Sequence, residues 1–199
     1  MSEIYCCSDY HFMHTNIIKY CARPFDNVEH MNAELERRWN ELVADDDIVM
    51  FIGDLSAGVG KRKDELGQII QRLKGKKVLI RGNHDHQKDS FYLQSGFKQV
   101  GDHAFFNGVL FTHGPAKHSE EHMHEVCHAA MKLKDKYKPV LIIHGHEHKL
   151  GPEHEGHYNC ASDRHDYRPF TLRSALVASG IESYADEIYE AIRLSVDAI

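Results

Sequence analysis

The chain has 199 residues, 42% hydrophobic and 27% charged, which is ordinary for a soluble globular protein and fits one domain over residues 1–199. Its net charge of −6 argues against broad nucleic-acid binding, because such binding needs a basic face. No apolar run reaches the ~18 residues of a membrane span, and the five cysteines show no CxxC spacing, so we expect a cytoplasmic protein without a disulfide framework.

The first half of the chain alternates predicted strands with predicted helices. Short β-branched runs predict buried strands, and apolar residues at helical spacing predict helices. The predicted strands cover residues 4–8, 48–52 and 78–80, and the predicted helices cover 15–20, 28–42 with Asn27 as N-cap, and 64–73. The acidic run at 45–47 is interpreted as a solvated turn. The order β-α-α-β-α-β indicates parallel strands joined by right-handed crossovers.

The second half is predicted to hold shorter strands and two longer helices. Asn107 and Gly108 tolerate positive φ, so they predict a hairpin between two of these strands. Ser119 is the predicted N-cap of the first long helix. The predicted strands cover residues 97–100, 103–106, 109–111, 140–143 and 158–161, and the predicted helices cover 119–136 and 181–196.

Polar residues follow strand after strand at the point where each strand ends. Because the carboxyl ends of parallel strands meet at one edge of a sheet, we expect these side chains to build one site. In Asp9-x-His11, and again in His146-x-His148, the spacing places two ligands on the same side of an extended chain. The residues at these strand ends are Asp9, His11, Asp54, Asn83, His84, Asp85, His113, His146 and His148.

The candidate metal ligands form a mixed oxygen and nitrogen set without a thiol. Such a set suits Mn, Fe, Zn, Co or Ni, and differs from the all-oxygen cages of Ca and Mg. Seven ligands are too many for one tetrahedral ion, but they fit two ions that share a carboxylate.

Taken in order, these motifs resemble the complete motif set of the calcineurin-like metallophosphoesterases. The resemblance covers residues 9–148, and the segments 12–25 and 158–172 are also similar to small bacterial and phage members. It implies an α/β fold, a four-layer α-β-β-α sandwich in which two mixed β-sheets are flanked by helices.

The resemblance also implies a role for each site residue. Two divalent ions, with Mn expected first, would share a bridging hydroxide that attacks phosphorus. His84 would stabilise the phosphoryl charge or protonate the leaving group. Asp85 would orient the His84 imidazole, or serve only as a helix N-cap or a surface carboxylate. Asp9, His11 and His148 would hold one ion, Asn83, His113 and His146 the other, and Asp54 would bridge them.

Two further residues are candidates for substrate contact. His14 follows the first motif closely and could reach the phosphate, and Arg23 could bind a second phosphate or a carboxylate. Arg168 is interpreted as structural. The histidines at 118, 122, 124 and 128 have pairwise i, i+4 spacing, but no carboxylate pattern accompanies them, so we expect an exposed helix face.

The substrate class is narrowed by one departure from the family. No Asp-Arg pair follows Gly53 and Asp54, which argues against the Ser/Thr protein phosphatase branch. An open dinuclear site suits a small phosphodiester, such as a cyclic nucleotide or another nucleotide. The alternatives are a phosphomonoesterase, a nuclease on DNA or RNA, and a non-catalytic scaffold. The acidic balance argues against a stable nucleic-acid partner, although Lys61, Arg62 and Lys63 lie near Asp54 in the sequence.

Overall fold

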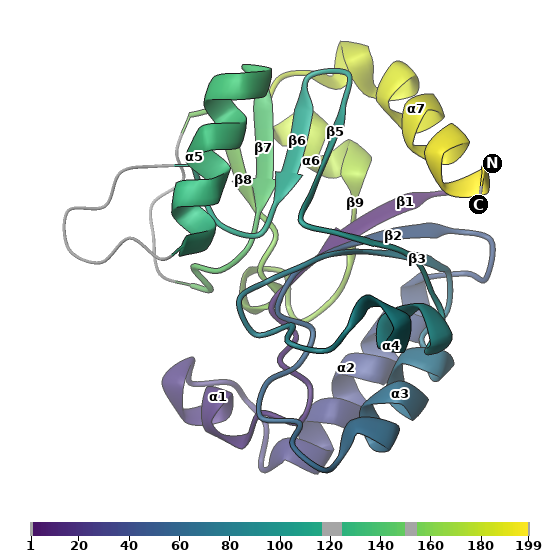
Figure 1. Cartoon of the computed structure of the whole chain (residues 1–199), viewed down its shortest axis with the longest axis vertical. Coiled ribbons are helices and arrows are strands. Elements are labelled where there is room, and N and C mark those ends of the chain that lie inside the picture. Colours follow the sequence, from purple (N-terminus) through teal and green to yellow (C-terminus); the bar gives the residue numbers. More distant parts are fainter. Residues whose placement is uncertain (1, 117–124, 150–154, 199) are drawn as a thin grey trace.

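The computed structural model describes residues 2–116, 125–149 and 155–198, which contain two β-sheets packed face to face (Figure 1). The strands are β1 (Ile4–Cys7), β2 (Ile48–Ile52), β3 (Lys76–Ile80), β4 (Phe97–Gly101), β5 (His103–Phe106), β6 (Val109–Thr112), β7 (Leu141–His144), β8 (His157–Asn159) and β9 (Phe170–Thr171). Within the described residues, the first sheet has the order β4-β3-β2-β1-β9 and the second the order β5-β6-β7-β8.

Both sheets are mixed. Strands β1 to β4 run parallel, as the predicted order of elements requires, and β9 joins the edge of this sheet antiparallel to β1. In the second sheet, β5 and β6 form the predicted hairpin through Asn107 (φ 43°) and Gly108 (φ 88°), and β7 and β8 continue parallel to β6. The predicted two-sheet sandwich is therefore confirmed.

Helices cover both outer faces of the sandwich, and the last two helices of the chain join the apolar layer between the sheets (Figure 1). The helices are α1 (Thr15–Tyr20), α2 (Val28–Leu42), α3 (Lys63–Arg72), α4 (Asp89–Gln94), α5 (Glu125–Tyr137), α6 (Leu172–Ala178) and α7 (Ala185–Asp197), with 3-10 turns η1 (Ser162–Arg164) and η2 (Glu182–Tyr184).

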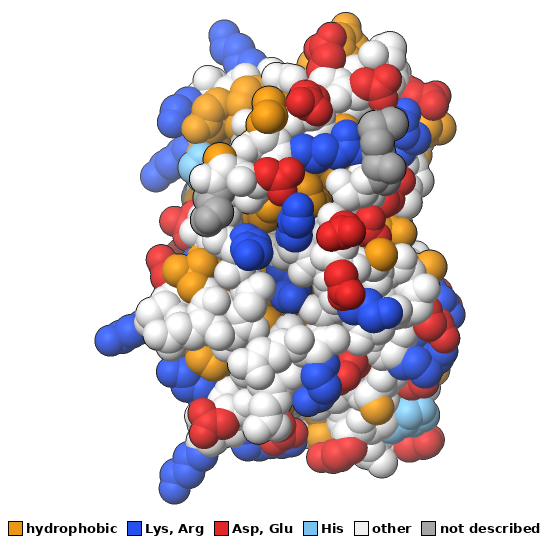
Figure 2. All heavy atoms as spheres, turned by 90° about the vertical axis from the view of Figure 1, so that its right-hand side faces the viewer, with side chains coloured by type: hydrophobic (Ala, Val, Ile, Leu, Met, Phe, Trp, Pro, Cys, Tyr) orange, Lys and Arg blue, Asp and Glu red, His pale blue; other side chains and the backbone are white. Residues whose placement is uncertain are grey.

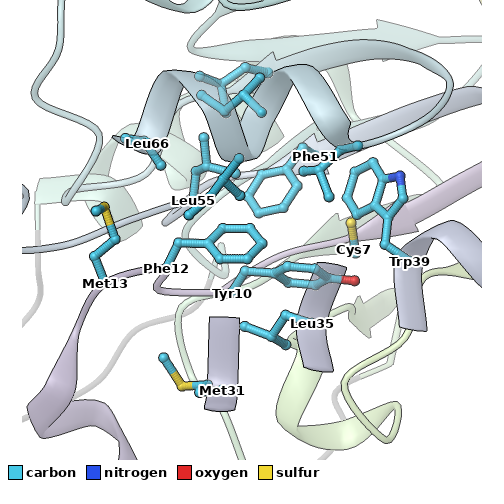
Figure 3. Packing of buried hydrophobic residues seen from close by; sticks show 14 of the residues in the cluster. Cys7, Tyr10, Phe12, Met13, Met31, Leu35, Trp39, Phe51, Leu55 and Leu66 are labelled. Carbon is cyan, nitrogen blue, oxygen red and sulfur yellow. The ribbon is translucent and has the colours of Figure 1, made fainter. Parts of the chain in front are cut away.

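Helices α2 and α3 cover the outer face of the first sheet. The predicted cap is confirmed, because the Asn27 side chain accepts a hydrogen bond from the His30 amide at 2.8 Å. The fully buried Trp39 and the Phe51 of β2 pack with Tyr10, whose ring lies 5.7 Å from the first and 5.3 Å from the second (Figure 3). Tyr10 follows β1 directly, so this apolar cluster fixes the start of a loop that carries predicted metal ligands.

The other core clusters hold the second sheet in place. Helix α5 covers the outer face of this sheet, where Ala130 packs near Leu110 and Ile142. Helices α6 and α7 join the apolar layer between the two sheets. Helix α6 was not predicted, and the terminal helix begins at Ala185 after the turn η2, later than the predicted residue 181.

The acidic run at 45–47 is expected to be a solvated turn. The acidic run is not wholly solvated, because the buried Asp47 accepts hydrogen bonds from the amides of Glu3 (2.8 Å) and Ala44 (2.9 Å), which tie the turn to the N-terminal strand.

The structure describes the predicted helix 119–136 only from residue 125 onward, where it forms α5. Ser119 and three residues of the histidine cluster (His118, His122 and His124) lie outside the described residues, and His128 is exposed on α5.

The surface drawn in Figure 2 interleaves Lys and Arg side chains with Asp and Glu side chains. That face therefore carries no continuous basic stripe of the kind that follows a nucleic-acid backbone. Among the described residues, no helix combines the length and apolarity needed to cross a bilayer.

Candidate metal centre

The predicted ligands lie on loops that leave the carboxyl ends of strands in both sheets. The loop after β1 pairs with the loop after β2, since the amides of Asp9 and His11 donate to the carbonyls of Gly53 (2.9 Å) and Asp54 (3.0 Å). In the second sheet, the Gly145 amide donates to the His113 carbonyl at 3.0 Å, which ties the loops after β6 and β7 together. Backbone pairing therefore fixes the positions of the ligand loops relative to one another.

The structure brings Asp9, His11 and His148 into one group, with ligand atoms that all lie within 4.8 Å of one another. The Nε2 atoms of His11 and His148 lie 4.0 and 3.7 Å from Oδ1 of Asp9. The two imidazole rings stack with centroids 5.1 Å apart. This is the set predicted for the first ion.

A second group contains Asp54, His113 and His146, again within 4.8 Å. The Nε2 atom of His113 lies 3.4 Å from Oδ2 of Asp54, and the rings of His113 and His146 are 5.2 Å apart. The same oxygen of Asp54 lies 3.5 Å from Nε2 of His11 in the first group. One carboxylate thus faces both groups, which is the position predicted for a bridging ligand.

The donor atoms of this site fit divalent cations. Among the described residues, His11 Nε2, His113 Nε2 and Asn83 Oδ1 are buried and make no aligned hydrogen bond. Buried polar atoms without partners are costly, and native structures leave few of them unless an ion or water is bound. Imidazole nitrogens and carboxylate or amide oxygens are ligands for Mn, Fe and Zn.

The ligand loops turn sharply at the ligands themselves. Five of the seven predicted ligands have positive φ: Asp9 (56°), His11 (53°), Asp54 (57°), His146 (71°) and His148 (47°). Residues other than glycine adopt this conformation rarely, at a cost of about 1–3 kcal/mol each, and such residues cluster at functional sites. The expectation that Asp9-x-His11 and His146-x-His148 are extended is therefore wrong, because left-handed residues rather than strand alternation aim these side chains.

Asp163 is a residue that the sequence analysis missed. Its Oδ2 atom lies 2.7 Å from Nδ1 of His148, on the side of the ring opposite the Nε2 that faces Asp9. A carboxylate on the second nitrogen fixes the tautomer and orientation of a metal-binding histidine. Asp163 lies in η1, within the segment 158–172, but it belongs to none of the ligand motifs, so only its proximity to His148 identifies it.

The prediction that Arg23 contacts substrate is wrong. The guanidinium is buried, and its donors are used within the protein: Nε and Nη2 bind Asp163 (3.0 and 2.8 Å), while Nη1 and Nη2 bind the carbonyls of Tyr10 (2.8 Å) and Asp9 (2.7 Å). Arg23 therefore links the Asp9 loop to the carboxylate that holds His148.

Asp85 also differs from its predicted role. Its carboxylate does not orient the His84 imidazole but accepts hydrogen bonds from the amides of Asp54 (2.8 Å), Leu55 (3.0 Å) and Gly82 (2.9 Å). Asp85 is 4% exposed, and burial raises its pKa to about 7. The residue fixes the turns that carry Asp54 and Asn83.

His84 and His14 border the site. The His84 side chain is 42% exposed, with Nε2 3.9 Å from Oδ2 of Asp54, and its amide donates to Oδ1 of the same carboxylate at 2.9 Å. The His14 ring lies 5.4 Å from the His11 ring and 6.2 Å from the His84 ring. A ligand atom of His84 also lies within 4.8 Å of those of His11 and Asp54, so His84 stands at the edge of the ligand groups, whereas His14 only borders them.

Carboxylates and imidazoles of the site shift one another's pKa values. At Asp54, burial raises the pKa of the carboxyl, but His113 and His11 outweigh burial and hold this pKa below its usual range. Burial lowers the pKa of His113, yet Asp54 raises it to about 9. Burial also lowers the pKa of His148, but the hydrogen bond with the Asp163 carboxylate outweighs burial and raises this pKa to about 10. The carboxylates thus favour protonation of His113 and His148, whereas burial holds the pKa of His11 well below its usual value.

Known proteins are similar to this chain in sequence and in structure. The family model for the calcineurin-like phosphoesterases matches residues 2–150. The chain is 41% identical over 132 residues to the uncharacterized protein MJ1445 of Methanocaldococcus jannaschii, covering 61% of this chain and 74% of that protein. It is 32% identical over 168 residues to the Gene 66 protein of Mycobacterium phage L5, covering 74% and 78%. The solved structure of AQ665 from Aquifex aeolicus, a protein of unknown function, matches with a TM-score of 0.69 at 25% identity, covering 88% of this chain and 98% of that one.

Proposed function

Because the chain belongs to the calcineurin-like phosphoesterase family, we propose that it hydrolyses phosphodiester bonds at a centre of two divalent metal ions. Manganese is the proposed metal. The proposed ligands of the first ion are Asp9, His11 and His148, those of the second are Asn83, His113 and His146, and Asp54 is shared.

The position of Asp54 is the observation that carries this proposal. Its Oδ2 atom lies 3.5 Å from Nε2 of His11 and 3.4 Å from Nε2 of His113, so it stands between the two ligand groups. Two ions bound there would lower the pKa of a water molecule between them and neutralise charge on the phosphoryl oxygens.

His84 is the proposed proton donor to the leaving group. Its imidazole stands beside Asp54 yet is half exposed, so it borders the space in which a substrate would meet the ions. From there, Nε2 can donate a proton to the departing oxygen or a hydrogen bond to the phosphoryl group. The buried Asp85 supports this arrangement indirectly, by fixing the backbone turns on either side.

A diester is the proposed substrate because it carries a second substituent that needs room. The exposure of His84 shows that this side of the site is open to solvent, so a retained substituent can be accommodated as well as a leaving group. A diester also has one negative charge fewer than a monoester dianion, so its binding requires less positive charge from the protein.

The proposal is tested by a hydrolysis screen on metal-free protein resupplied with Mn²⁺, Zn²⁺ or Mg²⁺. The substrates are bis(p-nitrophenyl) phosphate, p-nitrophenyl phosphate, and 2′,3′- and 3′,5′-cyclic nucleotides. Asp54→Asn should lose metal binding and hydrolysis together, whereas His84→Asn should keep both ions and lose turnover. His30→Asn, on the exposed face of α2, serves as the matched control.

Three results would contradict the proposal. Absence of hydrolysis with every metal would favour a non-catalytic scaffold. A clear preference for p-nitrophenyl phosphate would replace the diesterase with a phosphomonoesterase. Wild-type turnover of a cyclic nucleotide by His84→Asn would exclude the proton-donor role, because its alkoxide leaving group needs a proton.

A further inference from the structure

A row of aromatic rings leads from the candidate metal centre to solvent along α1. The His14 ring lies 5.4 Å from the ring of His11, a proposed ligand, and 6.2 Å from the ring of His84. The Tyr20 ring follows at 6.2 Å from His14, in an edge-to-face arrangement. Tyr20 is therefore one ring beyond a residue that borders the site.

Tyr20 is 72% exposed, which makes it the most exposed large apolar side chain among the described residues. The backbone that carries Tyr20 is anchored, because Ile17 of α1 is 4% exposed. An exposed aromatic residue is ordinary on a protein surface, and Tyr184 in η2 is 54% exposed. What distinguishes Tyr20 is its contact with His14 at the edge of the site.

The direction of the leaving group connects Tyr20 with the chemistry. On the proposed mechanism, the leaving oxygen departs beside His84, because this imidazole supplies its proton. Two rings neighbour His84, His14 at 6.2 Å and His86 at 6.5 Å, and a group that extends over His14 meets Tyr20 as the next ring outward. A nucleoside attached there would carry its base toward the exposed face of Tyr20.

We propose that His14 and Tyr20 form a subsite for the nucleobase of the leaving group. This inference rests on the proposed phosphodiesterase function and narrows its substrate class to nucleotide esters. Aromatic side chains bind bases by stacking, which tolerates base identity because every base has a π-face. The exposed Tyr20 offers such a face, and the partly buried His14 forms the inner wall of the subsite.

The test compares two ligands that share a phosphonate and differ by a base. Methylenephosphonate analogues of AMP and of ribose 5-phosphate are resistant to hydrolysis, and isothermal titration of the Mn²⁺-loaded protein gives their dissociation constants. The wild-type protein should prefer the AMP analogue. Tyr20→Ala should weaken binding of that analogue about 5- to 100-fold and leave the ribose analogue unchanged, whereas Tyr20→Phe should retain the preference. Tyr184→Ala, an exposed tyrosine on η2, is the control and should behave as wild type.

Several outcomes would overturn the inference. If Tyr20→Ala keeps the full preference for the AMP analogue, the base is not bound there. If Tyr20→Phe loses as much as Tyr20→Ala, a hydroxyl contact rather than stacking is responsible. If the ribose analogue binds and adenine adds nothing in the wild-type protein, the subsite is absent while the phosphoesterase proposal stands. If neither analogue binds while bis(p-nitrophenyl) phosphate is hydrolysed, the subsite is absent and the phosphoesterase proposal stands.

Discussion

The Nδ1 atom of His148 lies 2.7 Å from Oδ2 of Asp163, and Arg23 binds the same carboxylate through Nε and Nη2. Arg23 also donates to the carbonyls of Asp9 and Tyr10. The Asp9 loop and the His148 ring are thus held by one buried network. This network reaches into η1, which lies beyond the residues 2–150 matched by the family model.

We predict that Asp163→Asn weakens metal binding at the first group about 10- to 100-fold, because an amide orients the His148 ring less strongly than a carboxylate. The second group, with Asp54, His113 and His146, should keep its ion. Equilibrium dialysis with elemental analysis across a range of Mn²⁺ concentrations measures both sites.

Asp166→Asn is the matched control, since this carboxylate is 73% exposed and contacts only Arg38 and Arg168 among the described residues. It should bind Mn²⁺ as the wild type does. Equal loss of both ions in Asp163→Asn would show that the carboxylate maintains the fold of the site in general and does not act through His148.

Gly82 is required by the close approach of two loops. A Cβ atom at this position would overlap the carboxylate and amide of Asp54, which have no room to move because Asp85 binds that amide. We predict that Gly82→Ala abolishes metal-dependent hydrolysis and destabilises the protein by about 1–3 kcal/mol. Activity assays and urea unfolding would measure the two effects.

Gly101→Ala provides the comparison, because a Cβ atom there would meet its nearest neighbour at an ordinary 3.7 Å. This variant should retain hydrolysis. Full activity in Gly82→Ala would mean that the Asp54 carboxylate does not occupy the position described here.

Lys77 gives the protein a pH-dependent stability that is independent of the metal centre. The residue is 5% exposed in β3, where Nζ donates to the carbonyls of Leu73 (2.6 Å) and Gly75 (3.2 Å), and burial lowers its pKa to about 8. An unfolded lysine titrates near 10.4, so the unfolded state binds more protons between about pH 8 and 10.4. The contribution of Lys77 to stability is therefore least favourable below pH 8 and improves as the pH rises through this window.

We predict that the free energy of unfolding of the wild type, relative to Lys77→Met, rises by about 1–2 kcal/mol between pH 7.5 and pH 10. Urea unfolding of both proteins at each pH measures this difference. Contributions from titratable groups that both proteins contain cancel when the two free energies of unfolding are subtracted. Lys132→Met, at an exposed position in α5, is the control. A pH-independent difference for Lys77→Met would refute the prediction.

The location of the site could be predicted from sequence because local patterns determine it. Each buried β-branched run ends in polar ligand residues, and parallel pairing of β1, β2 and β3 brings those ends together. The hairpin at Asn107 and Gly108 follows from the same local chemistry.

The roles of Arg23 and Asp163 depend instead on tertiary contact. Arg23 and Asp163 are 140 residues apart in the chain, so no local pattern links them, and an arginine beside a ligand motif fits substrate binding equally well in sequence. The left-handed conformations at Asp9 and His11 were missed for a related reason, since pairing with the loop after β2 imposes them. Helix α6 is seven residues long, too short for its periodicity to stand out.

Anomalous diffraction from crystals grown with Mn²⁺ shows most directly whether two divalent ions share the carboxylate of Asp54. We predict two peaks about 3.5–4 Å apart, one beside each ligand group, with Asp54 between them. A single peak, or ions bound away from Asp54, would show that the Asp54 carboxylate is not shared by two ions.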